Sequence, residues 1–435
     1  GCSAVIKPAE QTPVIAALAT RLLHEAGVPL NAMQLLPGGG EVGAALTASP
    51  AIDGVCFTGS TATAKRIHTT LATKGNARAP LIAETGGLNA MIVDSTALPE
   101  QATRDIIASA FQSAGQRCSA LRCLYVQEDI AAGFTEMLTG AMAALKVGDP
   151  WDMATDVGPI IDAAAQSKIA AHIGQARQEG RVVFETPHGA QGNFIAPTLI
   201  KVDGIADMGE EIFVPVLHIA TFRSQDLDQV IAGINATGYG LTFGLHSRID
   251  DRVQQVVDQV HAGNIYVNRN QIGAIVGSQP FGGECLSGTG PKAGGPHYLL
   301  KFMKEPRVES PQAFQSLPGP TGESNRLMVL PRAPLLCIGP DIGAQMAAVD
   351  AAGGRPVEGA FEDVGKLDDI GGVIYWGADD AQIRAIRQVL AAREGAILPL
   401  ITEQPSVADV MAERHTCIDT TASGGNAQLL AEVGS

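Results

Sequence analysis

The sequence of 435 residues predicts an α/β protein built from more than one domain. Short apolar stretches alternate with stretches of helical periodicity along almost the whole chain. Glycine is abundant, with 50 residues, and aromatic residues make up only 4% of the sequence, a composition typical of folds with many tight turns. The length also exceeds what one hydrophobic core usually serves, so we expect two or three domains.

Charge and cysteine content exclude several classes of protein. The net charge of −15 argues against a general nucleic-acid surface. The seven cysteines are irregularly spaced without a paired CxxC, which predicts neither a disulfide framework nor a metal site and favours a reducing cytoplasm. No apolar run reaches membrane-spanning length, because Arg332 interrupts the best candidate. The chain opens directly on a strand pattern, so we expect further sequence upstream of Gly1.

The first elements alternate between strand and helix. Residues 3–7 read as a strand that Pro8 ends, and Thr12-Pro13 predicts the start of a helix that runs to about residue 26. A short strand follows at 33–36. Lys7 and Glu10 follow the first strand, where they could hold the ribose hydroxyls of an adenosine; solvated surface charges are the alternative.

A second strand–turn–helix unit is the better candidate for a phosphate contact. Residues 54–57 form an apolar strand, Thr58-Gly59-Ser60-Thr61 a turn, and residues 62–70 the start of a helix. Backbone N–H groups and a hydroxyl at a helix N-terminus suit a pyrophosphate. An ordinary capped turn is the alternative.

The chemistry is predicted between Glu84 and Cys118, which lie 34 residues apart (118 − 84). Oxidation of a carbonyl through a covalent intermediate needs a nucleophile that is partly thiolate and a base that activates water. We expect Gly115 to clear space for a substrate and Arg117 to favour the thiolate. The alternative is that Cys118 is an inert buried thiol.

The stretch between and beyond these residues continues the α/β pattern. Arg104 and Asp105 are expected on the exposed side of the helix that precedes Cys118, and residues 210–216 as an ordinary edge strand. The glycine-rich loop 272–290 could bind a carboxylate through its backbone N–H groups. Other predicted strands cover 81–84, 90–93, 121–126 with an alternating pattern, 181–184, 198–202, 243–245 and 264–268, and other helices 102–113, 130–145, 166–178, 227–235 and 251–260.

The C-terminal part reads as a separate unit. A stretch rich in Pro, Gly and Ser predicts a linker at about 305–323. Beyond it, a small α/β domain lacks a glycine-rich phosphate turn, so we expect it to bind no cofactor. Its predicted strands are 335–338, 372–375 and 396–400, and its predicted helices are 343–352 and 381–393.

Six short motifs in order resemble the NAD(P)-dependent aldehyde dehydrogenase superfamily. Longer stretches, Ala83–Asp94, Ser113–Arg122 and Ser287–Pro296, are similar to the L-glutamate γ-semialdehyde dehydrogenase half of bifunctional proline-catabolic flavoenzymes. The six motifs are Lys7–Glu10, Phe57–Thr61, Glu84–Gly87, Gly115–Cys118, Glu211–Pro215 and Pro280–Gly283.

The resemblance implies an aldehyde dehydrogenase fold followed by a small α/β C-terminal domain. The implied parts are a partial Rossmann-type NAD domain (1–86), an α/β catalytic domain (87–304), a linker (305–330), a small Rossmann-like domain (331–415) and a lid or oligomerisation tail (416–435).

The resemblance also implies a role for each motif. Cys118 would attack the aldehyde to give a thiohemiacetal, hydride would pass to the nicotinamide, and Glu84 would activate the water that hydrolyses the thioester. The substrate would be a small aldehyde with a carboxylate, and the protein a homo-oligomer. Cofactor contacts would come from Lys7, Glu10, Gly59, Ser60, Glu211 and Phe213, and substrate contacts from Ser119, Gly273 and Ala274.

Three features qualify the resemblance. The family's oxyanion-hole asparagine would precede Gly1, as would any proline dehydrogenase barrel with its FAD, which leaves the activity of the isolated chain open. Ala64 stands where the family usually has a second glycine. Glu10 favours NAD over NADP, because a carboxylate near the 2′ position repels a phosphate. An aldehyde dehydrogenase of other specificity, or an inactive fragment with an assembly role, remains an alternative.

Overall fold

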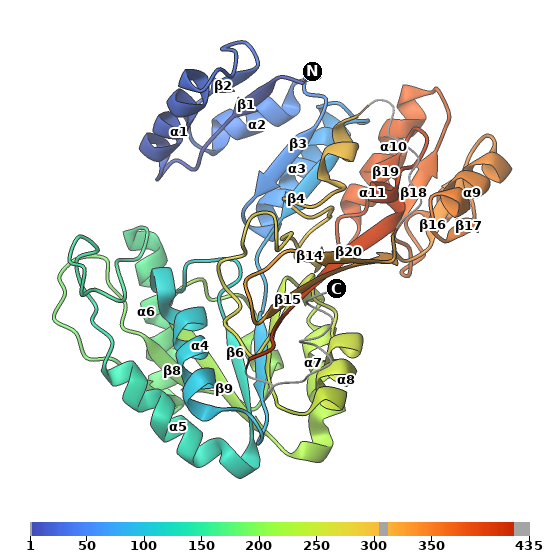
Figure 1. Cartoon of the computed structure of the whole chain (residues 1–435). Coiled ribbons are helices and arrows are strands. Elements are labelled where there is room, and N and C mark those ends of the chain that lie inside the picture. Colours follow the sequence, from blue (N-terminus) through green and yellow to red (C-terminus); the bar gives the residue numbers. More distant parts are fainter. Residues whose placement is uncertain (1, 304–311, 422–435) are drawn as a thin grey trace.

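A ten-stranded mixed sheet forms the centre of the computed structural model, which describes residues 2–303 and 312–421 (Figure 1). The strand order is β14-β15-β20-β12-β11-β5-β6-β9-β8-β7, parallel from β20 to β8 and antiparallel at both ends. The strands are β5 (Ala90–Val93), β6 (Cys123–Gln127), β7 (Val182–Glu185), β8 (Thr198–Lys201), β9 (Val216–Phe222), β11 (Thr242–His246), β12 (Asn264–Val267), β14 (Phe314–Leu317), β15 (Glu323–Pro331) and β20 (Met411–Asp419).

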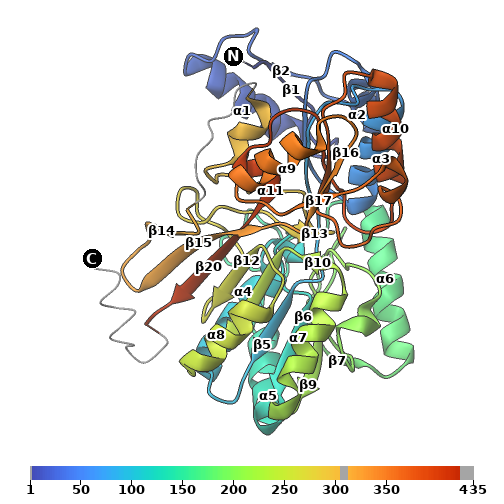
Figure 2. The same ribbon diagram turned by 90° about the vertical axis from the view of Figure 1, so that its right-hand side faces the viewer.

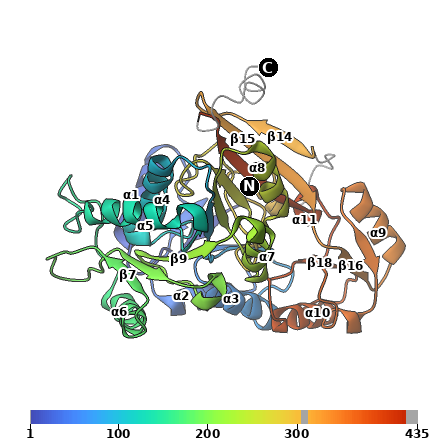
Figure 3. The ribbon, with the colours of Figure 1, turned by 90° about the horizontal axis from the view of Figure 1, so that it is seen from below.

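Helices cover both faces of this sheet (Figures 1 and 3). On one face α4 (Pro99–Phe111), α5 (Glu128–Ala143) and α6 (Ala163–Gln178) pack into one hydrophobic cluster. On the other face α7 (Leu227–Ala236) and α8 (Asp250–Gln259) pack into a second. A parallel sheet needs cover on both faces, which explains why its strands are nearly continuous apolar runs.

The N-terminal part contains two separate parallel strand pairs (Figure 1). The first pair is β1 (Ala4–Ile6) with β2 (Met33–Leu35), and the second is β3 (Val55–Thr58) with β4 (Leu81–Glu84). Pro13 opens the first helix as predicted, but the Thr12 side chain makes no capping hydrogen bond. The helices of this part are α1 (Pro13–Glu25), α2 (Gly40–Ala48) and α3 (Thr61–Thr73).

The C-terminal part has its own parallel sheet of four strands in the order β17-β16-β18-β19. After it the chain returns to the main sheet, where β20 lies between β15 and β12 (Figure 2). Its elements are β16 (Leu335–Ile338), α9 (Ile342–Ala351), β17 (Pro356–Glu358), β18 (Gly372–Tyr375), α10 (Asp380–Ala392), β19 (Leu400–Ile401) and α11 (Val407–Val410). The remaining short elements are the strands β10 (Tyr239–Gly240) and β13 (Glu284–Cys285) and the 3-10 helices Gln112–Gly115, Ile205–Met208, Ser224–Asp226, Tyr298–Phe302 and Phe361–Asp363.

Several sequence-based predictions are wrong. The described part of the predicted linker at 305–330 contains β14 and β15, which extend the main sheet. Asp105 is only 3% exposed rather than facing solvent. The strand after Cys118 shows no alternation, because all five residues of β6 are buried.

Two further segments differ from prediction. Residues 210–215 form no strand; the strand there is β9, which starts at Val216 and lies inside the sheet. The predicted tail begins within β20, and residues 422–435 lie outside the described residues. Within residues 2–303 and 312–421, no helix has both the length and the apolar character needed to span a bilayer.

The C-terminal part contacts the N-terminal part through α10, which packs against α3 (Figures 2 and 3). Arg387 Nη1 donates to the carbonyl oxygens of Ala77 and Ala79, both at 2.7 Å. Arg384 donates to the carbonyls of Ala72 and Gly75, at 3.0 and 3.1 Å. The Arg384 guanidinium thus lies at the C-terminal end of α3, where the helix dipole favours positive charge.

We predict that Arg387→Met destabilises this contact, because it leaves two buried carbonyl groups without a donor. The expected loss in free energy of unfolding is about 2 kcal/mol. Urea denaturation followed by the fluorescence of Trp376, in the C-terminal part, measures it. Lys366→Met, a change at an exposed site in the same part, is the control. Equal urea midpoints for both variants would contradict the prediction.

Candidate active site

Cys118 follows a sharp turn at the end of α4. Ser113, Ala114 and Gly115 all have left-handed backbone angles, with φ of 57°, 54° and 64°. A Cβ atom on Gly115 would lie 2.3 Å from the carbonyl oxygen of Val214, so only glycine fits there. The expectation that Gly115 clears space for substrate is therefore wrong: its absent side chain makes room for the backbone of the neighbouring loop.

The backbone around Cys118 is fixed while its thiol remains partly exposed. Asn89, a buried residue just before β5, donates from Nδ2 to the carbonyls of Cys118 and Ala120, at 2.6 and 2.9 Å. Gln271 Nε2 donates to the carbonyl of Ser119 at 3.2 Å, which ties the loop 271–279 to the same turn. The thiol therefore stands on a rigid support.

A buried cation, Arg122, organises this turn. Its guanidinium donates to the carbonyl of Gly115 at 2.7 Å and to that of Arg117 at 3.0 Å. It also forms an ion pair of 3.1 Å with Glu211. A buried charge is tolerated only with partners of this kind. Arg122 lies within one of the stretches similar to the family, but no local pattern in the sequence predicts its role.

Glu84 is the last residue of β4, and one of its two carboxylate oxygens accepts a hydrogen bond. Oε2 accepts a hydrogen bond of 2.8 Å from the Gly283 N–H. No group in the described residues donates to Oε1, which is buried. Cβ atoms on Gly282 and Gly288 would lie 3.0 and 2.8 Å from Oε1, so these two glycines leave space for the carboxylate.

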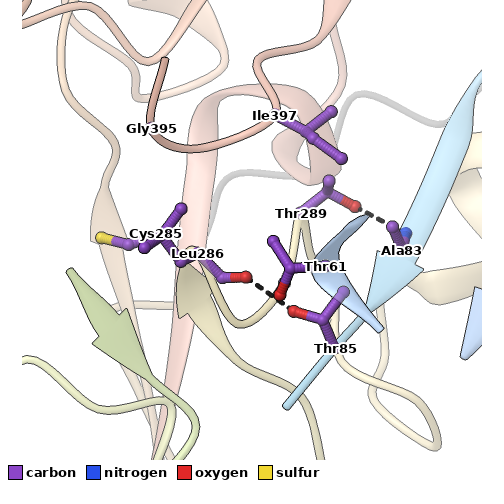
Figure 4. A pocket seen from close by; sticks show the side chains of 9 residues that line it. Thr61, Ala83, Thr85, Cys285, Leu286, Thr289, Gly395 and Ile397 are labelled. Atoms are coloured by element: carbon purple, nitrogen blue, oxygen red, sulfur yellow. Dashed lines mark hydrogen bonds between the residues drawn. The ribbon is translucent and has the colours of Figure 1, made fainter. Parts of the chain in front are cut away.

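The strand carrying Glu84 is attached to the loop that supplies those glycines (Figure 4). Thr85 Oγ1 donates to the carbonyl of Leu286 at 2.6 Å, and Thr289 Oγ1 accepts from the N–H of Ala83 at 3.0 Å. Ile397, from the C-terminal part, lines the same small space. Hydrogen bonds on both sides of Glu84 therefore fix the direction of its side chain.

Both reactive groups are poised in their neutral forms. Burial raises the pKa of Glu84 to about 8, although the Gly283 N–H and Lys292 oppose the shift. Burial also raises the pKa of the Cys118 thiol, and the negative charges of Glu84 and then Glu211 raise it further. The structure thus brings Cys118, Glu84 and Glu211 within electrostatic reach of one another.

Arg117 does not act on the thiol as expected. Its Nε donates to Ser113 Oγ at 3.0 Å, and the Cys118 pKa is raised rather than lowered. A Cβ atom on Gly273 would lie 3.8 Å from Arg117 Nη1. The Arg117 side chain therefore lies beside the loop of Gly273 and Ala274, which was expected to bind a carboxylate.

The other predicted substrate residues lie on the same side of the turn. Ser119 is buried directly after Cys118, and Ala274 is partly exposed. Gly273 is exposed and has a φ of 72°, a backbone conformation that favours glycine. Through the bond from Gln271 to Ser119, this loop and the nucleophile turn form one unit.

The predicted phosphate turn adjoins the strand of the base. Ser60 is the N-cap of α3, and its Oγ accepts from the Thr63 N–H at 3.2 Å. The Gly59 N–H donates to the carbonyl of Glu84 at 3.0 Å. The N-terminus of a 13-residue helix is therefore presented next to Glu84.

Glu211 and Phe213 lie next to the nucleophile turn, whereas Lys7 and Glu10 belong to the first strand pair. A Cβ atom on Gly86 would lie 1.8 Å from Glu211 Oε2, so the glycine admits this carboxylate. Phe213 is 45% exposed, and the guanidinium of Arg122 lies 5.1 Å from its ring centroid. Lys7 Nζ and Glu10 Oε2 are 3.8 Å apart just beyond β1.

Comparison with known proteins places this geometry in context. Residues 1–308 match the aldehyde dehydrogenase family. The bifunctional protein PutA of Escherichia coli is 41% identical over 524 aligned positions, which cover 99% of this chain and 40% of PutA. The chain thus spans less than half the length of that relative.

Solved structures of similar fold come from the same group of proteins. A mutant of Bradyrhizobium japonicum proline utilization A (PutA) superposes with a TM-score of 0.67 at 56% identity, covering 69% of this chain and 31% of that one. A 1-pyrroline-5-carboxylate dehydrogenase from Thermus, solved with bound NAD, superposes with a TM-score of 0.65 at 34% identity. The shared region covers 69% of this chain and 59% of the Thermus chain.

Proposed function

The chain belongs to the aldehyde dehydrogenase family, and on this premise we propose that it oxidises L-glutamate γ-semialdehyde to L-glutamate with NAD, as a step of proline breakdown. The observation that carries the proposal is the pairing of a partly exposed thiol, Cys118, with a buried carboxylate, Glu84, whose charge acts on it. The names of the similar proteins, PutA and 1-pyrroline-5-carboxylate dehydrogenase, support the substrate.

The residues present fit a nicotinamide dinucleotide. Gly59 and Ser60 directly precede α3, and the first-turn backbone N–H groups of a helix are of the kind that bind a pyrophosphate, so both residues are proposed to lie against it. Glu211 and the exposed ring of Phe213 adjoin the nucleophile and are proposed to hold the nicotinamide ribose and ring. Lys7 and Glu10 are proposed to hold the adenosine ribose. When bound, NAD supplies the acceptor for the hydride that leaves the aldehyde carbon.

The chain's own residues perform the covalent steps. The Cys118 sulfur attacks the aldehyde carbon, a C–S bond forms, and the thiol proton passes to the carbonyl oxygen. Loss of the hydride from that carbon and of the hydroxyl proton to solvent would leave the product on Cys118 as a thioester. Glu84 then accepts a proton from a water molecule while the oxygen of that water attacks the thioester carbon. The C–S bond breaks, and the carboxylate product and the thiol are released. Oε1, to which no described group donates a hydrogen bond, is the oxygen proposed to take that proton.

Substrate choice is proposed to lie with the loop of Gly273 and Ala274 together with Ser119. Exposed backbone N–H groups of this loop suit a carboxylate, and Arg117 adds a positive charge beside it. The substrate carries a carboxylate at the end opposite its aldehyde. Binding that carboxylate here would direct the aldehyde toward Cys118.

We also propose a homo-oligomer in the cytoplasm. Among the described residues, β14 is an edge strand of the main sheet and carries Phe314, which is 52% exposed; an edge strand of this kind can pair with another copy. All seven cysteines are free, as expected in a reducing compartment. FAD has no role in the chemistry proposed for this chain.

The activity is tested by following NADH formation from glutamate γ-semialdehyde with the full-length protein. Cys118→Ala should abolish it, because the proposed covalent intermediate forms on the Cys118 sulfur, the thiol on which the charge of Glu84 acts. Cys2→Ala, at an exposed cysteine, is the matched control and should leave the rate unchanged. Equal rates in both variants would refute the mechanism.

Substrate choice is tested with Arg117→Met. Removing a charge-assisted contact should raise the KM for glutamate γ-semialdehyde by about tenfold or more, while the KM for a simple aliphatic aldehyde stays the same. Arg177→Met, on the exposed face of α6, is the control. If the aliphatic aldehyde is the better substrate of the unaltered protein, the chain is an aldehyde dehydrogenase of other specificity.

A further inference from the structure

Lys292 is a buried cation in the stretch Ser287–Pro296, to which no role has been given so far. Its side chain is only 2% exposed. Nζ donates to Asn264 Oδ1 at 2.9 Å and, through a short contact, to the carbonyl of Gly282. Burying an ammonium group is costly without partners, so its position requires an explanation.

The two groups that accept hydrogen bonds from Lys292 Nζ, Asn264 Oδ1 and the Gly282 carbonyl, belong to contacts that adjoin Glu84. Asn264, on β12, also accepts from the Gly282 N–H at 3.2 Å and donates to the carbonyl of Pro280 at 2.9 Å. Lys292 and Asn264 thus hold the turn 280–282 from one side. The next residue, Gly283, donates the hydrogen bond that Glu84 Oε2 accepts.

The backbone has been shaped to admit this lysine. A Cβ atom on Gly263 would lie 2.0 Å from the carbonyl oxygen of Gly282 and 2.7 Å from Lys292 Nζ. Any larger residue there would separate the ammonium from the turn.

The C-terminal strand β20 fixes the other end of Lys292. Glu413 Oε2 accepts from the Lys292 N–H at 2.7 Å, and Glu413 Oε1 contacts His297 Nδ1 at 2.7 Å. Glu413 is buried, so its own charge also reaches the site.

The charges around Lys292 and Glu84 have opposing effects on the pKa values of these two residues. Burial lowers the pKa of Lys292, and the negative charges of Glu84, then of Glu284 on β13 and of Glu413, oppose this shift, whereas Arg414 on β20 adds to it. For Glu84, Lys292 lowers the pKa and Glu413 raises it.

The remaining titratable neighbours are neutral or distant from Lys292. Burial lowers the pKa of His415, on β20, to about 3, so this imidazole is neutral at pH 7. Tyr298, in the 3-10 helix 298–302, has its pKa raised, first by burial, and is neutral as well. Cys118 and Glu211 face Glu84 from the nucleophile side. Lys292 is therefore the cation that favours ionised Glu84 in the described surroundings.

We propose that Lys292 is a positioning residue for the base: it holds the turn that binds Glu84 Oε2 and supplies the positive charge that favours the ionised carboxylate. The proposal rests on the proposed role of Glu84. Without the ammonium group, Glu84 would ionise only at higher pH and hydrolysis of the thioester would slow, whereas attack by Cys118 would not.

The test compares two substitutions in the full-length protein, one that removes a positive charge near Glu84 and one that removes a negative charge. Ionised Glu84 is needed, so kcat should rise with pH through about 8 in the unaltered protein. Lys292→Met should move this acid limb upward by about one pH unit, a loss in kcat of about tenfold at pH 7. Glu413→Gln keeps an acceptor for the Lys292 N–H but removes a negative charge, so the limb should move downward. The first NADH turnover, which precedes hydrolysis of the thioester, should be no slower in Lys292→Met than in the unaltered protein.

An alkylation measurement separates this proposal from the proposed function. The rate at which iodoacetamide modifies Cys118, read by peptide mass spectrometry, requires no turnover. Neutral Glu84 makes the thiol easier to ionise. At pH 8, Lys292→Met should therefore react faster than the unaltered protein and Glu413→Gln more slowly.

The outcomes are distinct. Changes of opposite sign in the alkylation rate of the two variants support the role of Lys292, whether or not an aldehyde is oxidised. Absence of aldehyde oxidation would reject only the proposed function. Unchanged alkylation profiles, or shifts of the same sign in both variants, would overturn the proposal. If Lys292→Met does not fold, as judged by circular dichroism, Lys292→Gln, which keeps a donor for the turn without the positive charge, replaces it, and the limb should again move upward.

Discussion

The site depends on the crowding of three acidic groups, Cys118, Glu84 and Glu211, in a partly buried space. Ionised groups of like sign repel strongly there, and burial penalises each of them. Two buried cations offset this repulsion: Arg122 pairs with Glu211, and Lys292 acts on Glu84. The balance leaves Glu84 with a pKa of about 8, so that it can exchange protons near neutral pH.

Glycines and long-range contacts make this crowding possible. Gly86, Gly115 and Gly288 stand where a side chain would collide with a functional carboxylate or with the backbone that supports it. The hydrogen bond between Lys292 and Glu413 spans 121 residues, because β20 returns to the main sheet only after the whole C-terminal unit. The C-terminal part therefore contributes to the surroundings of the base, although it carries none of the proposed catalytic residues.

Local patterns predicted much of the fold, because strands such as β4 and helices such as α10 are marked by periodicity and flanking residues. The motifs also indicated the pairing of Cys118 with Glu84. Arg122 and Lys292 could not be found this way, since a buried cation is recognised only by partners distant in sequence. The same limit explains 305–330: its Pro, Gly and Ser content resembles a linker, but pairing with β20 turns part of it into strands.

The central claim is that the substrate becomes covalently bound to Cys118 and is released by Glu84. Its most direct test is mass spectrometry of the Cys118 peptide after the Glu84→Gln variant is mixed with NAD and glutamate γ-semialdehyde. Our account predicts one NADH per chain, then arrest, with the acyl group retained on Cys118. Sustained turnover with an unmodified Cys118 would contradict it.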